Sequence, residues 1–442
     1  MTSKHPFSGG LDAWIEQLST NGGGWSTELR KAAAERYRET GLPGARHEDY
    51  RQINLNALSR VERTVPAASG VVDDARLEAF AIEGLGAIRL VMVDGHFDAA
   101  RSALGELGDG VEVESLYGAA EARREAATPG LQRDAQEGAT GFEALNAAGF
   151  RDGVVIRVAD GVRVERPIHL LHVSTAHDVP SVVHPRVVIA LGTSAEATVV
   201  EDHVALDGSD DFVNAVVDAR LEANSQLDAV RVIRTGGEHL HVGSFRGHVA
   251  RDARLRQHAL VVDGALVRQD VRAYLEGENS EVVLNGLVVL DREQVADNHT
   301  WVHHNVPYTR SDERYRNVLD GKARGVFMGR VVVAEGAKGT DAQQNNANLL
   351  LSNDAQVNTL PQLEIYNDDV KASHGATLGQ LDRDGLFYLR SRGIEEATAR
   401  GLLTFAFASE VVEAMPSAAL RRFARRSIFE HLPHDHLSEE LV

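Results

Sequence analysis

One segment of the sequence concentrates side chains that could ligate a metal ion or transfer a proton. Between residues 361 and 379, Asp368 and Asp369 are followed by Lys371, Ser373 and His374, with short apolar runs on either side. A neutral imidazole near pH 7 can ligate iron or pass a proton. The residues alone leave a second interpretation open, in which the segment is a loop with a capping aspartate and a hydrogen-bonded histidine.

A pair of histidines, His239 and His241, forms a second candidate. The His-x-His spacing places both imidazoles on one face of a strand, where they could ligate a metal ion. Gly236 and Gly237 precede the pair, so the motif loosely resembles a metal motif of cupins. Because the expected downstream glutamate and histidine partners are not convincingly placed, we favour a polar outer strand face over a cupin-like metal site.

A denser polar cluster follows at residues 297–304. On a strand, His299, Trp301 and His303 would share one face, which could bind a single metal ion. A partner surface or an internal hydrogen-bonded ladder is the favoured interpretation. His434 and His436 lie in a polar tail, and we expect them to be solvated.

Several kinds of active site lack their sequence motifs. There is no G-x-x-x-x-G-K-[ST] phosphate loop, no convincing G-x-G-x-x-G and no G-x-S-x-G elbow. ATP hydrolysis by this chain and serine-hydrolase chemistry are therefore not expected. The chain contains no cysteine, which excludes disulfides, thiolate nucleophiles and sulfur ligands for iron or zinc.

Composition and charge narrow the class of protein further. The chain has 442 residues, 43% of them hydrophobic, which is enough apolar material for a sizeable core. A formal net charge of −19 disfavours nucleic acid and anionic membranes as partners and favours a partner with a basic patch. The first residues lack the apolar run of a signal peptide, and no apolar stretch approaches the roughly 20 residues that cross a bilayer. We therefore expect a cytoplasmic protein.

The elements that must position these residues fall into four expected regions. Residues 1–65 are expected to be helical, with helices at 11–18 and 27–38. Residues 66–150 are mixed α/β: a strand at 88–93 enters a tight turn, and helices follow at 119–127 and 141–148. Residues 151–390 are expected to form the β core, and residues 391–442 a C-terminal helical region.

The β core contains a recurring turn-like pattern. A polar residue is followed by Ser or Ala, any residue and an apolar one; the second positions are Ala195, Ser225, Ala253, Ser280 and Ala355. Three successive steps of 30, 28 and 27 residues and a last one of 75, close to three shorter steps, suit a solenoid whose coils stack on one another. A β-sandwich with evenly spaced hairpins is the alternative, and we favour the β-helix.

Helical periodicity returns after Gly393. An apolar stripe runs from Ile394 to Met415, and Pro416 interrupts it before a second helix that carries a basic run of arginines. Such a helix could cap an open solenoid end or dock onto a partner.

Several segments together resemble the SufD branch of the SufB/SufD family, which assembles iron–sulfur clusters. The matching segments are residues 311–316, 325–329, 340–352, 361–379 and 386–393, with weaker matches at 48–51 and 142–146. The resemblance covers most of the C-terminal half, and the joint occurrence of these motifs in order is highly specific. It implies a mainly β chain with a right-handed parallel β-helix core between N-terminal and C-terminal helical regions.

The resemblance also implies partners and a site. The expected partners are a SufB-type sister subunit and a SufC-type ATPase docked on the C-terminal helices, where Leu402, Phe405 and Phe407 are the expected contacts. A cysteine desulfurase and a sulfur-transfer protein would act indirectly. His374 corresponds to a family histidine that faces the sister subunit, where a nascent cluster is thought to form, with Asp368, Asp369, Lys371 and Ser373 beside it.

The same resemblance implies how sulfur and cofactors are handled. The family commonly has a cysteine at the position of Ala372, and Leu389 stands where the sister branch has its cysteine. Sulfur chemistry therefore falls to the partner, and iron or a cluster would be bound only transiently in the complex, with no cofactor held stably by this chain alone. A flavin could enter through the partner. The expected role is a non-enzymatic scaffold.

Three other functions fit the residues less well and remain open. A β-helix enzyme acting on polysaccharides, such as a lyase, would use clustered carboxylates with calcium and a basic residue. A cupin-like metal-binding protein would use His239 and His241. The third is a structural solenoid without chemistry.

Overall fold

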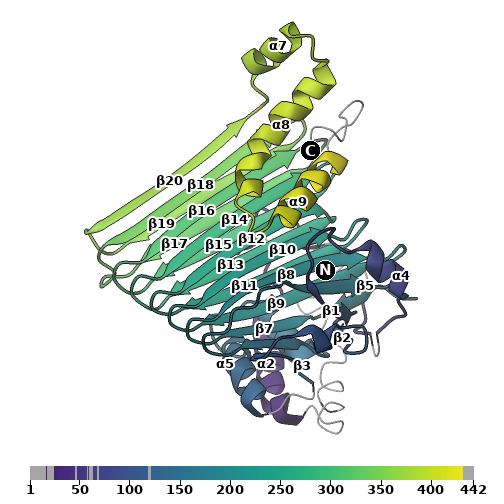
Figure 1. Cartoon of the computed structure of the whole chain (residues 1–442), viewed down its shortest axis with the longest axis vertical. Helices are drawn as coiled ribbons and strands as arrows, with labels where there is room; N and C mark the ends of the chain where they lie inside the picture. Colours follow the sequence, from purple (N-terminus) through teal and green to yellow (C-terminus); the bar gives the residue numbers. More distant parts are fainter. Residues whose placement is uncertain are drawn as a thin grey trace.

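The computed structural model of the chain describes residues 16, 24–44, 47–56, 58, 63–66, 69–117 and 121–431. Its centre is a parallel β-solenoid built from two sheets, as predicted, with helices at both ends of the chain (Figure 1). Successive strands alternate between the sheets, so each coil adds one strand to each sheet. The space between the two sheets, called the lumen here, is filled by packed side chains.

The first sheet, called sheet 1, has the order β2-β1-β5-β8-β10-β12-β14-β16-β18-β20. Its strands are β1 (Ile88–Val93), β2 (His96–Phe97), β5 (Ile168–Ser174), β8 (Glu196–Ala205), β10 (Gln226–Arg234), β12 (Arg254–Asp263), β14 (Glu281–Leu290), β16 (Arg310–Leu319), β18 (Thr340–Leu350) and β20 (Val370–Gly379).

The second sheet, sheet 2, has the order β19-β17-β15-β13-β11-β9-β7-β4-β3, and β6 also pairs with β9. Its strands are β3 (Val111–Ser115), β4 (Val154–Val158), β6 (Ser181–Val183), β7 (Arg186–Leu191), β9 (Asp211–Leu221), β11 (Leu240–Val249), β13 (Leu266–Leu275), β15 (Val295–His304), β17 (Arg324–Val333) and β19 (Gln356–Ile365).

The recurring turn pattern has a conformational cause. Four of its five first residues, Ser194, Asn224, Asp252 and Asn279, have positive φ angles of 59–61°, whereas the last, Asp354, does not. Asparagine and aspartate tolerate this left-handed conformation better than other non-glycine residues. The side chains also stack between coils: the Asn224 amide donates to Ser194 Oγ at 2.9 Å, and the Asn279 amide donates to Asp252 Oδ1 at 2.8 Å. The pattern therefore marks the turn at which one coil passes to the next.

The helices of the described residues are η1 (Gly24–Ser26), α2 (Thr27–Thr40), η2 (Glu48–Tyr50), α4 (Asp74–Ala79), η3 (Leu104–Glu106), α5 (Glu121–Asp134), α6 (Gly141–Gly149), α7 (Arg383–Ser391), α8 (Glu396–Glu413) and α9 (Ala418–His431). The helices predicted at 27–38, 119–127 and 141–148 correspond to α2, α5 and α6. The helix predicted at 11–18 lies outside the described residues except for Glu16.

The strand predicted at 88–93 is β1, and the tight turn after it contains Asp94 and Gly95 with positive φ. β1 pairs in parallel with β5, so the solenoid takes up a strand that precedes residue 151. At the other end β20 closes sheet 1 at Gly379, and α7 begins at Arg383.

The N-terminal helices cover the outer face of sheet 2 through buried charges. Asp134, the last residue of α5, accepts hydrogen bonds from Arg186 of β7 and from Arg246 of β11. Asp218 of β9 contacts the same two arginines, at 2.9 Å and 2.7 Å. Burial alone would raise the pKa of Asp218, but the guanidinium groups of Arg246 and Arg186 hold it below its usual value. This network, with Arg272 bound to Glu143 of α6, ties the helices to the sheet.

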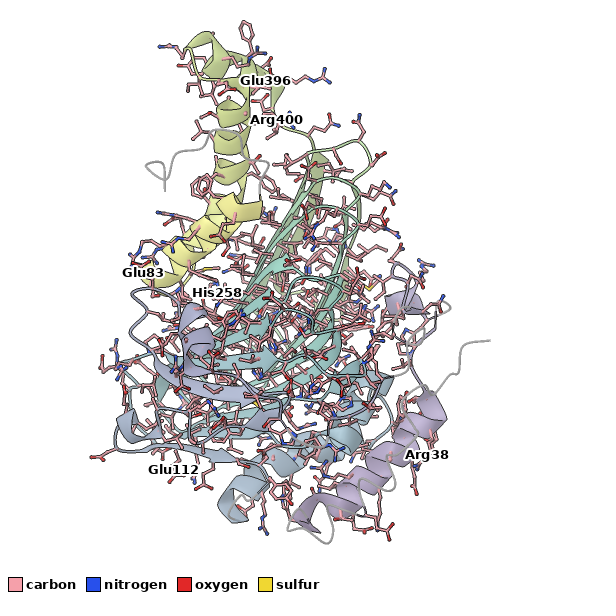
Figure 2. All side chains as sticks on the ribbon, turned by 90° about the vertical axis from the view of Figure 1, so that its right-hand side faces the viewer. Arg38, Glu83, Glu112, His258, Glu396 and Arg400 are labelled. Atoms are coloured by element: carbon pink, nitrogen blue, oxygen red, sulfur yellow. The ribbon has the colours of Figure 1, made fainter. Side chains whose placement is uncertain are left out.

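The C-terminal helices α8 and α9 cover part of the outer face of sheet 1. Apolar residues of both helices, including Ala408 and Leu420, pack on outward residues of the sheet such as Val232, Leu260 and Leu287. Glu410 of α8 also pairs with Arg316 of β16. α7 and the first turns of α8 extend beyond the sheets, where Figure 2 labels Glu396 and Arg400.

Candidate functional site

The end of the solenoid opposite the N-terminal helices is open. β19 and β20 are the last strands of their sheets, and each pairs with only one neighbouring strand among the described residues. The side chains of β20 are mostly exposed and those of β19 mostly half-buried, in contrast to the buried strands of the earlier coils. Ile365, Tyr366 and Leu378 are 40%, 63% and 59% exposed. An uncovered strand edge with apolar side chains is a surface on which another chain can pair.

His374 lies on this open end and faces the lumen side of β20. It is in register with Gln344 of β18, which is in register with Glu313 of β16. Residues in register on parallel strands share one face of the sheet. Thr300, on the opposite sheet, donates a hydrogen bond to Glu313, so this face is the interior one. His374 is exposed because no further coil covers it.

Glu313, Gln344 and His374 form a polar column that ends at the surface. Gln344 Nε2 donates to Glu313 Oε1 at 3.1 Å, while Gln344 Oε1 is buried and has no partner among the described residues. Burial raises the pKa of Glu313 to about 7, against the hydrogen bonds from Thr300 and Gln344 that favour the ionised form. The column therefore contains a buried carboxyl group that can change its protonation near neutral pH.

Glu313 and Gln344 were not identified from the sequence, although a signal was present. The steps from Glu313 to Gln344 and from Gln344 to His374 are 31 and 30 residues. These steps match the coil period, so stacking the coils residue by residue would have placed the three side chains in one column.

The other predicted site residues lie in two different places. Lys371 and Ser373 are on β20 but point to the outer face, where Ser373 Oγ donates to Gln343 Oε1. Asp368 and Asp369 lie in the turn between β19 and β20. At about 3.3 Å per residue, that turn is more than roughly 13 Å from His374 along the strand. The structure thus brings neither the carboxylates nor Lys371 to the face that carries the imidazole.

The expected ATPase contacts lie on α8 and are half-buried. Phe405 stacks on Phe429 of α9, with ring centroids 5.3 Å apart, and the Arg316 guanidinium lies 5.9 Å from the centre of the Phe407 ring. Packing inside this chain therefore occupies part of both rings. The large exposed aromatic side chains of this region lie on α7, where Phe387 and Tyr388 are 75% and 57% exposed.

The His-x-His pair is buried, which corrects the prediction of a polar outer strand face. His239 and His241 are 2% and 1% exposed, because the segment enters the solenoid interior and not its surface. The His239 ring lies 2.7 Å from Ser209 Oγ, whereas the His241 ring packs edge-on against His203. The two imidazoles thus have different neighbours, contrary to a cupin-like arrangement.

The side chains at 297–304 form ion pairs and ring contacts within the chain. His299 Nε2 lies 2.9 Å from Asp297, which also pairs with the buried Arg268. His303 stacks on Tyr274 with centroids 4.9 Å apart. His299, Trp301 and His303 do share one strand face, as predicted, and it is a polar ladder on sheet 2. His434 and His436 lie outside the described residues.

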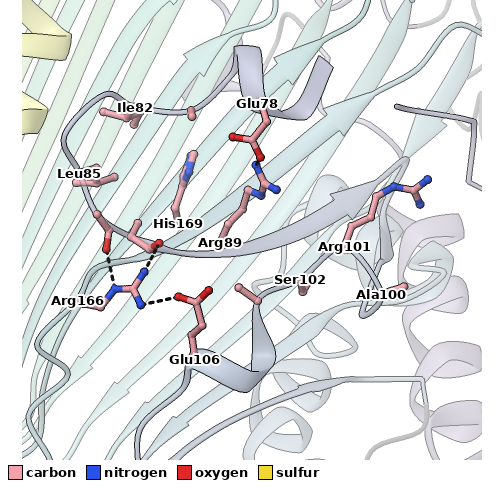
Figure 3. A pocket seen from close by; sticks show the side chains of 14 residues that line it. Glu78, Ile82, Leu85, Arg89, Ala100, Arg101, Ser102, Glu106, Arg166 and His169 are labelled. Atoms are coloured by element: carbon pink, nitrogen blue, oxygen red, sulfur yellow. Dashed lines mark hydrogen bonds and ion pairs between the residues drawn. The ribbon is translucent and has the colours of Figure 1, made fainter. Parts of the chain in front are cut away.

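A surface pocket of about 410 Å³ lies beside β1 and η3, away from His374 (Figure 3). Its charged side chains are paired within the chain. Arg166 contacts Glu106 at 2.5 Å and donates to the carbonyl oxygens of Gly86 and Ala87. Arg89 pairs with Glu78 at 2.7 Å. Because these charges already satisfy one another, the pocket offers little to an ionic ligand.

Among the described residues, no helix is both long enough and apolar enough to span a bilayer.

Comparisons with known proteins place both halves of the chain in one family. Residues 17–170 match the sequence model of the SufBD protein N-terminal region, and residues 172–407 match that of the SUF system FeS cluster assembly, SufBD core domain. The chain is 32% identical to the iron–sulfur cluster assembly protein SufD of Escherichia coli over 428 residues, 96% of this chain and 97% of the relative. It is 30% identical to an iron–sulfur cluster assembly SufBD family protein of Synechocystis over 90% of this chain and 89% of the relative. The SufD protein of Bacillus subtilis is 26% identical over 63% of this chain and 64% of the relative.

Proposed function

The chain belongs to the SufBD family of iron–sulfur cluster assembly proteins, as its motifs predicted. From this premise we propose that it is a non-enzymatic scaffold, and that its open solenoid end receives iron or a nascent cluster at His374. The observation that carries the proposal is an exposed imidazole on the last coil, aligned with a buried polar column. Iron and the cluster are cargo here, bound transiently. An imidazole nitrogen is a suitable ligand for iron.

The missing sulfur ligand favours a site shared with a second subunit. The chain has no cysteine, so thiolate ligands for a cluster must come from elsewhere. We infer a cysteine-bearing SufB-type sister subunit that covers the open end, pairing with the strand edges of β19 and β20. A cysteine desulfurase and a sulfur-transfer protein would supply sulfur through that sister, and a flavin would also enter through it.

A SufC-type ATPase is the second proposed partner, docked on α7 and α8. Exposed Phe387 and Tyr388 support such docking, with Leu402, Phe405 and Phe407 contributing the faces that they keep free. This placement would also couple the ATPase to the site. Glu410 of α8 binds Arg316, and Arg316 donates to Asn345 Oδ1 at 2.6 Å.

The coupling ends beside His374. Asn345 lies on β18 and is in register with Gly375, the residue after His374 on β20. A movement of α8 would therefore pull on the last two strands of sheet 1 through the side chain of Arg316. In this scheme the ATPase changes the shape of the open end, and this chain itself hydrolyses nothing.

The test of the proposed function is His374→Ala in the purified complex. Loss of the imidazole removes an iron ligand from the interface, and we expect the initial rate of cluster formation to fall at least about tenfold, equivalent to about 1.4 kcal/mol. Cluster formation is followed by anaerobic absorption spectroscopy, and integrity of the complex by size-exclusion chromatography.

Thr377→Ala is the matched control, since Thr377 lies on the same exposed strand but faces away from the lumen. It should leave the rate unchanged. An undiminished rate for His374→Ala, with the complex intact, would remove His374 from the mechanism.

Docking of the sister subunit on the open end gives a separate prediction. Leu378 is 59% exposed in the free chain and would be buried under the sister. Leu378→Asp would then bury an unpaired charge, and we expect the dissociation constant of the complex to rise at least about tenfold. Val71→Asp is the control, because Val71 is 92% exposed and far from the open end in the sequence. Equal binding by both variants, measured by calorimetry, would place the sister elsewhere.

A further inference from the structure

A cluster of three histidines and one glutamate lies inside the solenoid, in the first coils and many strands from His374. His172 of β5 and His203 of β8 are in register, and Glu201 precedes His203 on the same face of β8. His241 reaches the cluster from β11 on the opposite sheet, where its ring centroid is 4.6 Å from that of His203. All four side chains are buried, with exposed fractions of 7% or less.

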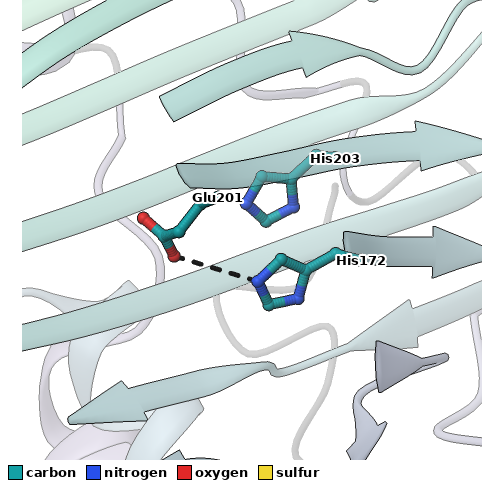
Figure 4. Close-up of side chains that lie close together, drawn as sticks. All are labelled: His172, Glu201 and His203. Carbon is teal, nitrogen blue, oxygen red and sulfur yellow. Dashed lines mark ion pairs between the residues drawn. The ribbon is translucent and has the colours of Figure 1, made fainter. Parts of the chain in front are cut away.

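Figure 4 shows the Glu201 carboxylate beside the rings of His172 and His203, with a dashed line that joins it to His172. The His172 and His203 rings are 4.3 Å apart and nearly parallel. Glu201 Oε1 lies 3.9 Å from His172 Nε2, and one donor atom from each of His172, Glu201 and His203 falls within 4.8 Å of the others. Among the described residues this is the one such group of three.

The polar atoms of the cluster are short of partners. Both nitrogens of His172, both nitrogens of His241, His203 Nε2 and Glu201 Oε1 are buried without a hydrogen bond among the described residues. Buried polar atoms in native proteins almost always have a partner, and a concentration of orphans indicates an ion or ordered water. A cavity of about 10 Å³, lined by His172 and His203, borders the cluster. This volume is close to the smallest that holds one water molecule or one ion.

The surrounding charges select the kind of occupant. Glu201 Oε2 accepts two hydrogen bonds from Arg231, at 3.0 Å and 2.9 Å, which balances the carboxylate charge and leaves Oε1 free. Burial lowers the pKa of His172 to about 3, and it also lowers the pKa of His203 and His241 well below the usual value. The imidazoles are therefore neutral, the form that ligates metals.

We propose that His172, Glu201, His203 and His241 bind one divalent transition-metal ion inside the solenoid. Three imidazole nitrogens and one carboxylate oxygen suit zinc or ferrous iron, whereas magnesium and calcium prefer oxygen ligands. Metal–ligand bonds of about 2.0–2.2 Å require the four donor atoms to move closer together. The stacked imidazole rings must also rotate about χ2, a torsion angle that varies widely in histidine. The site would hold the early coils of the two sheets together, independently of cluster handling at His374.

The experiment uses the full-length protein freed of metal by dialysis against a chelator. Zinc, ferrous iron under anaerobic conditions, or magnesium is added, and bound metal is measured by mass spectrometry after desalting. We expect about one zinc or iron per chain and no retained magnesium. His203→Gln and His241→Gln should each lose this metal ion.

His258→Gln is the matched control, because His258 is also buried and has an unpartnered Nε2, yet lies outside the cluster, on the face of β12 that packs beneath the C-terminal helices. It should keep the metal. Retention of metal by His203→Gln, or equal loss in His258→Gln, would overturn the proposal. Loss in His374→Ala alone would assign the ion to the open end and leave the proposed function standing without this site.

X-ray absorption of the native protein loaded with zinc tests the site even where a variant fails to fold. Scattering from at least two imidazoles in the first shell is the expected result. A shell of oxygen atoms alone, or zinc well below one equivalent, would indicate an adventitious ion only and would contradict the proposal.

Discussion

Replacing Asp134 with alanine is expected to lower the free energy of unfolding by about 3–5 kcal/mol, because it leaves two buried arginines without their shared carboxylate. Arg186 and Arg246 are both completely or almost completely buried, and Asp134 accepts hydrogen bonds from each of them. Asp218 and Glu143, which lies 3.6 Å from Arg246, would then face three arginines, because Glu143 also pairs with Arg272. Urea denaturation followed by circular dichroism measures the loss, and hydrogen exchange should show that α5 and α6 open first.

An exposed ion pair provides the comparison for this loss. Glu28 and Lys31 lie 2.9 Å apart on the surface of α2, with exposed fractions of 86% and 55%. Glu28→Ala should change stability by less than about 1 kcal/mol, since water already solvates both charges. Similar small losses for Glu28→Ala and Asp134→Ala would mean that the N-terminal helices do not depend on the buried network.

Glu313→Gln is expected to stabilise the protein in alkaline solution and not in acid. The folded-state pKa of Glu313 is raised from 4.5 to about 7, so the unfolded chain ionises first as the pH rises. The uncharged Glu313 contributes stability below pH 4.5, and this contribution is lost as the pH rises from 4.5 to 7. The difference of about 2.5 between the two pKa values corresponds to about 3 kcal/mol. The amide of glutamine carries no charge and can keep both hydrogen bonds, with Thr300 accepting and Gln344 donating.

The measurement is the difference in unfolding free energy between variant and native protein at pH 4.5 and pH 8.5. The advantage of Glu313→Gln should be about 3 kcal/mol at pH 8.5 and close to zero near pH 4.5. Glu293→Gln, at a carboxylate that is 78% exposed, should show no such dependence. A pH-independent difference for Glu313→Gln would show that the pKa of Glu313 is the same in the folded and the unfolded chain, contrary to the prediction.

The solenoid was predictable because its signal is local and repeated. Four copies of the recurring turn place a residue at positive φ, and in three of them Asn224, Asp252 and Asn279 supply it at intervals near the coil length. The helices 27–38 and 141–148 were predictable for the same reason, since periodicity and a capping box at Thr140 and Glu143 are encoded within a few residues.

The interior sites were less predictable because they depend on register. His172, Glu201, His203 and His241 are spread over 70 positions and meet only when strands of two sheets are aligned. A shift of one residue in one coil would turn any of these side chains to the outer face. The same dependence misled the interpretation of His239 and His241, whose alternation predicts a shared face but not whether that face is inside.

His374 is an intermediate case. The motif around it identified the segment, yet motif proximity also suggested that Asp368, Asp369, Lys371 and Ser373 act beside it. Strand geometry separates them, because neighbours on a strand face opposite sides and the turn lies several residues away. Roles for those four residues remain predictions, as do the cytoplasmic location and the named partners.

The uncovered last coil has a thermodynamic consequence. In a stack of coils each unit is stabilised by its neighbours, and a terminal unit has only one. β19 and β20 therefore belong to the part of the solenoid that opens at the lowest free energy, and their amide hydrogens should exchange fastest among its strands. A subunit that stacks on this end would supply the absent neighbour, so binding it and completing the folding of the coil that carries His374 become a single event.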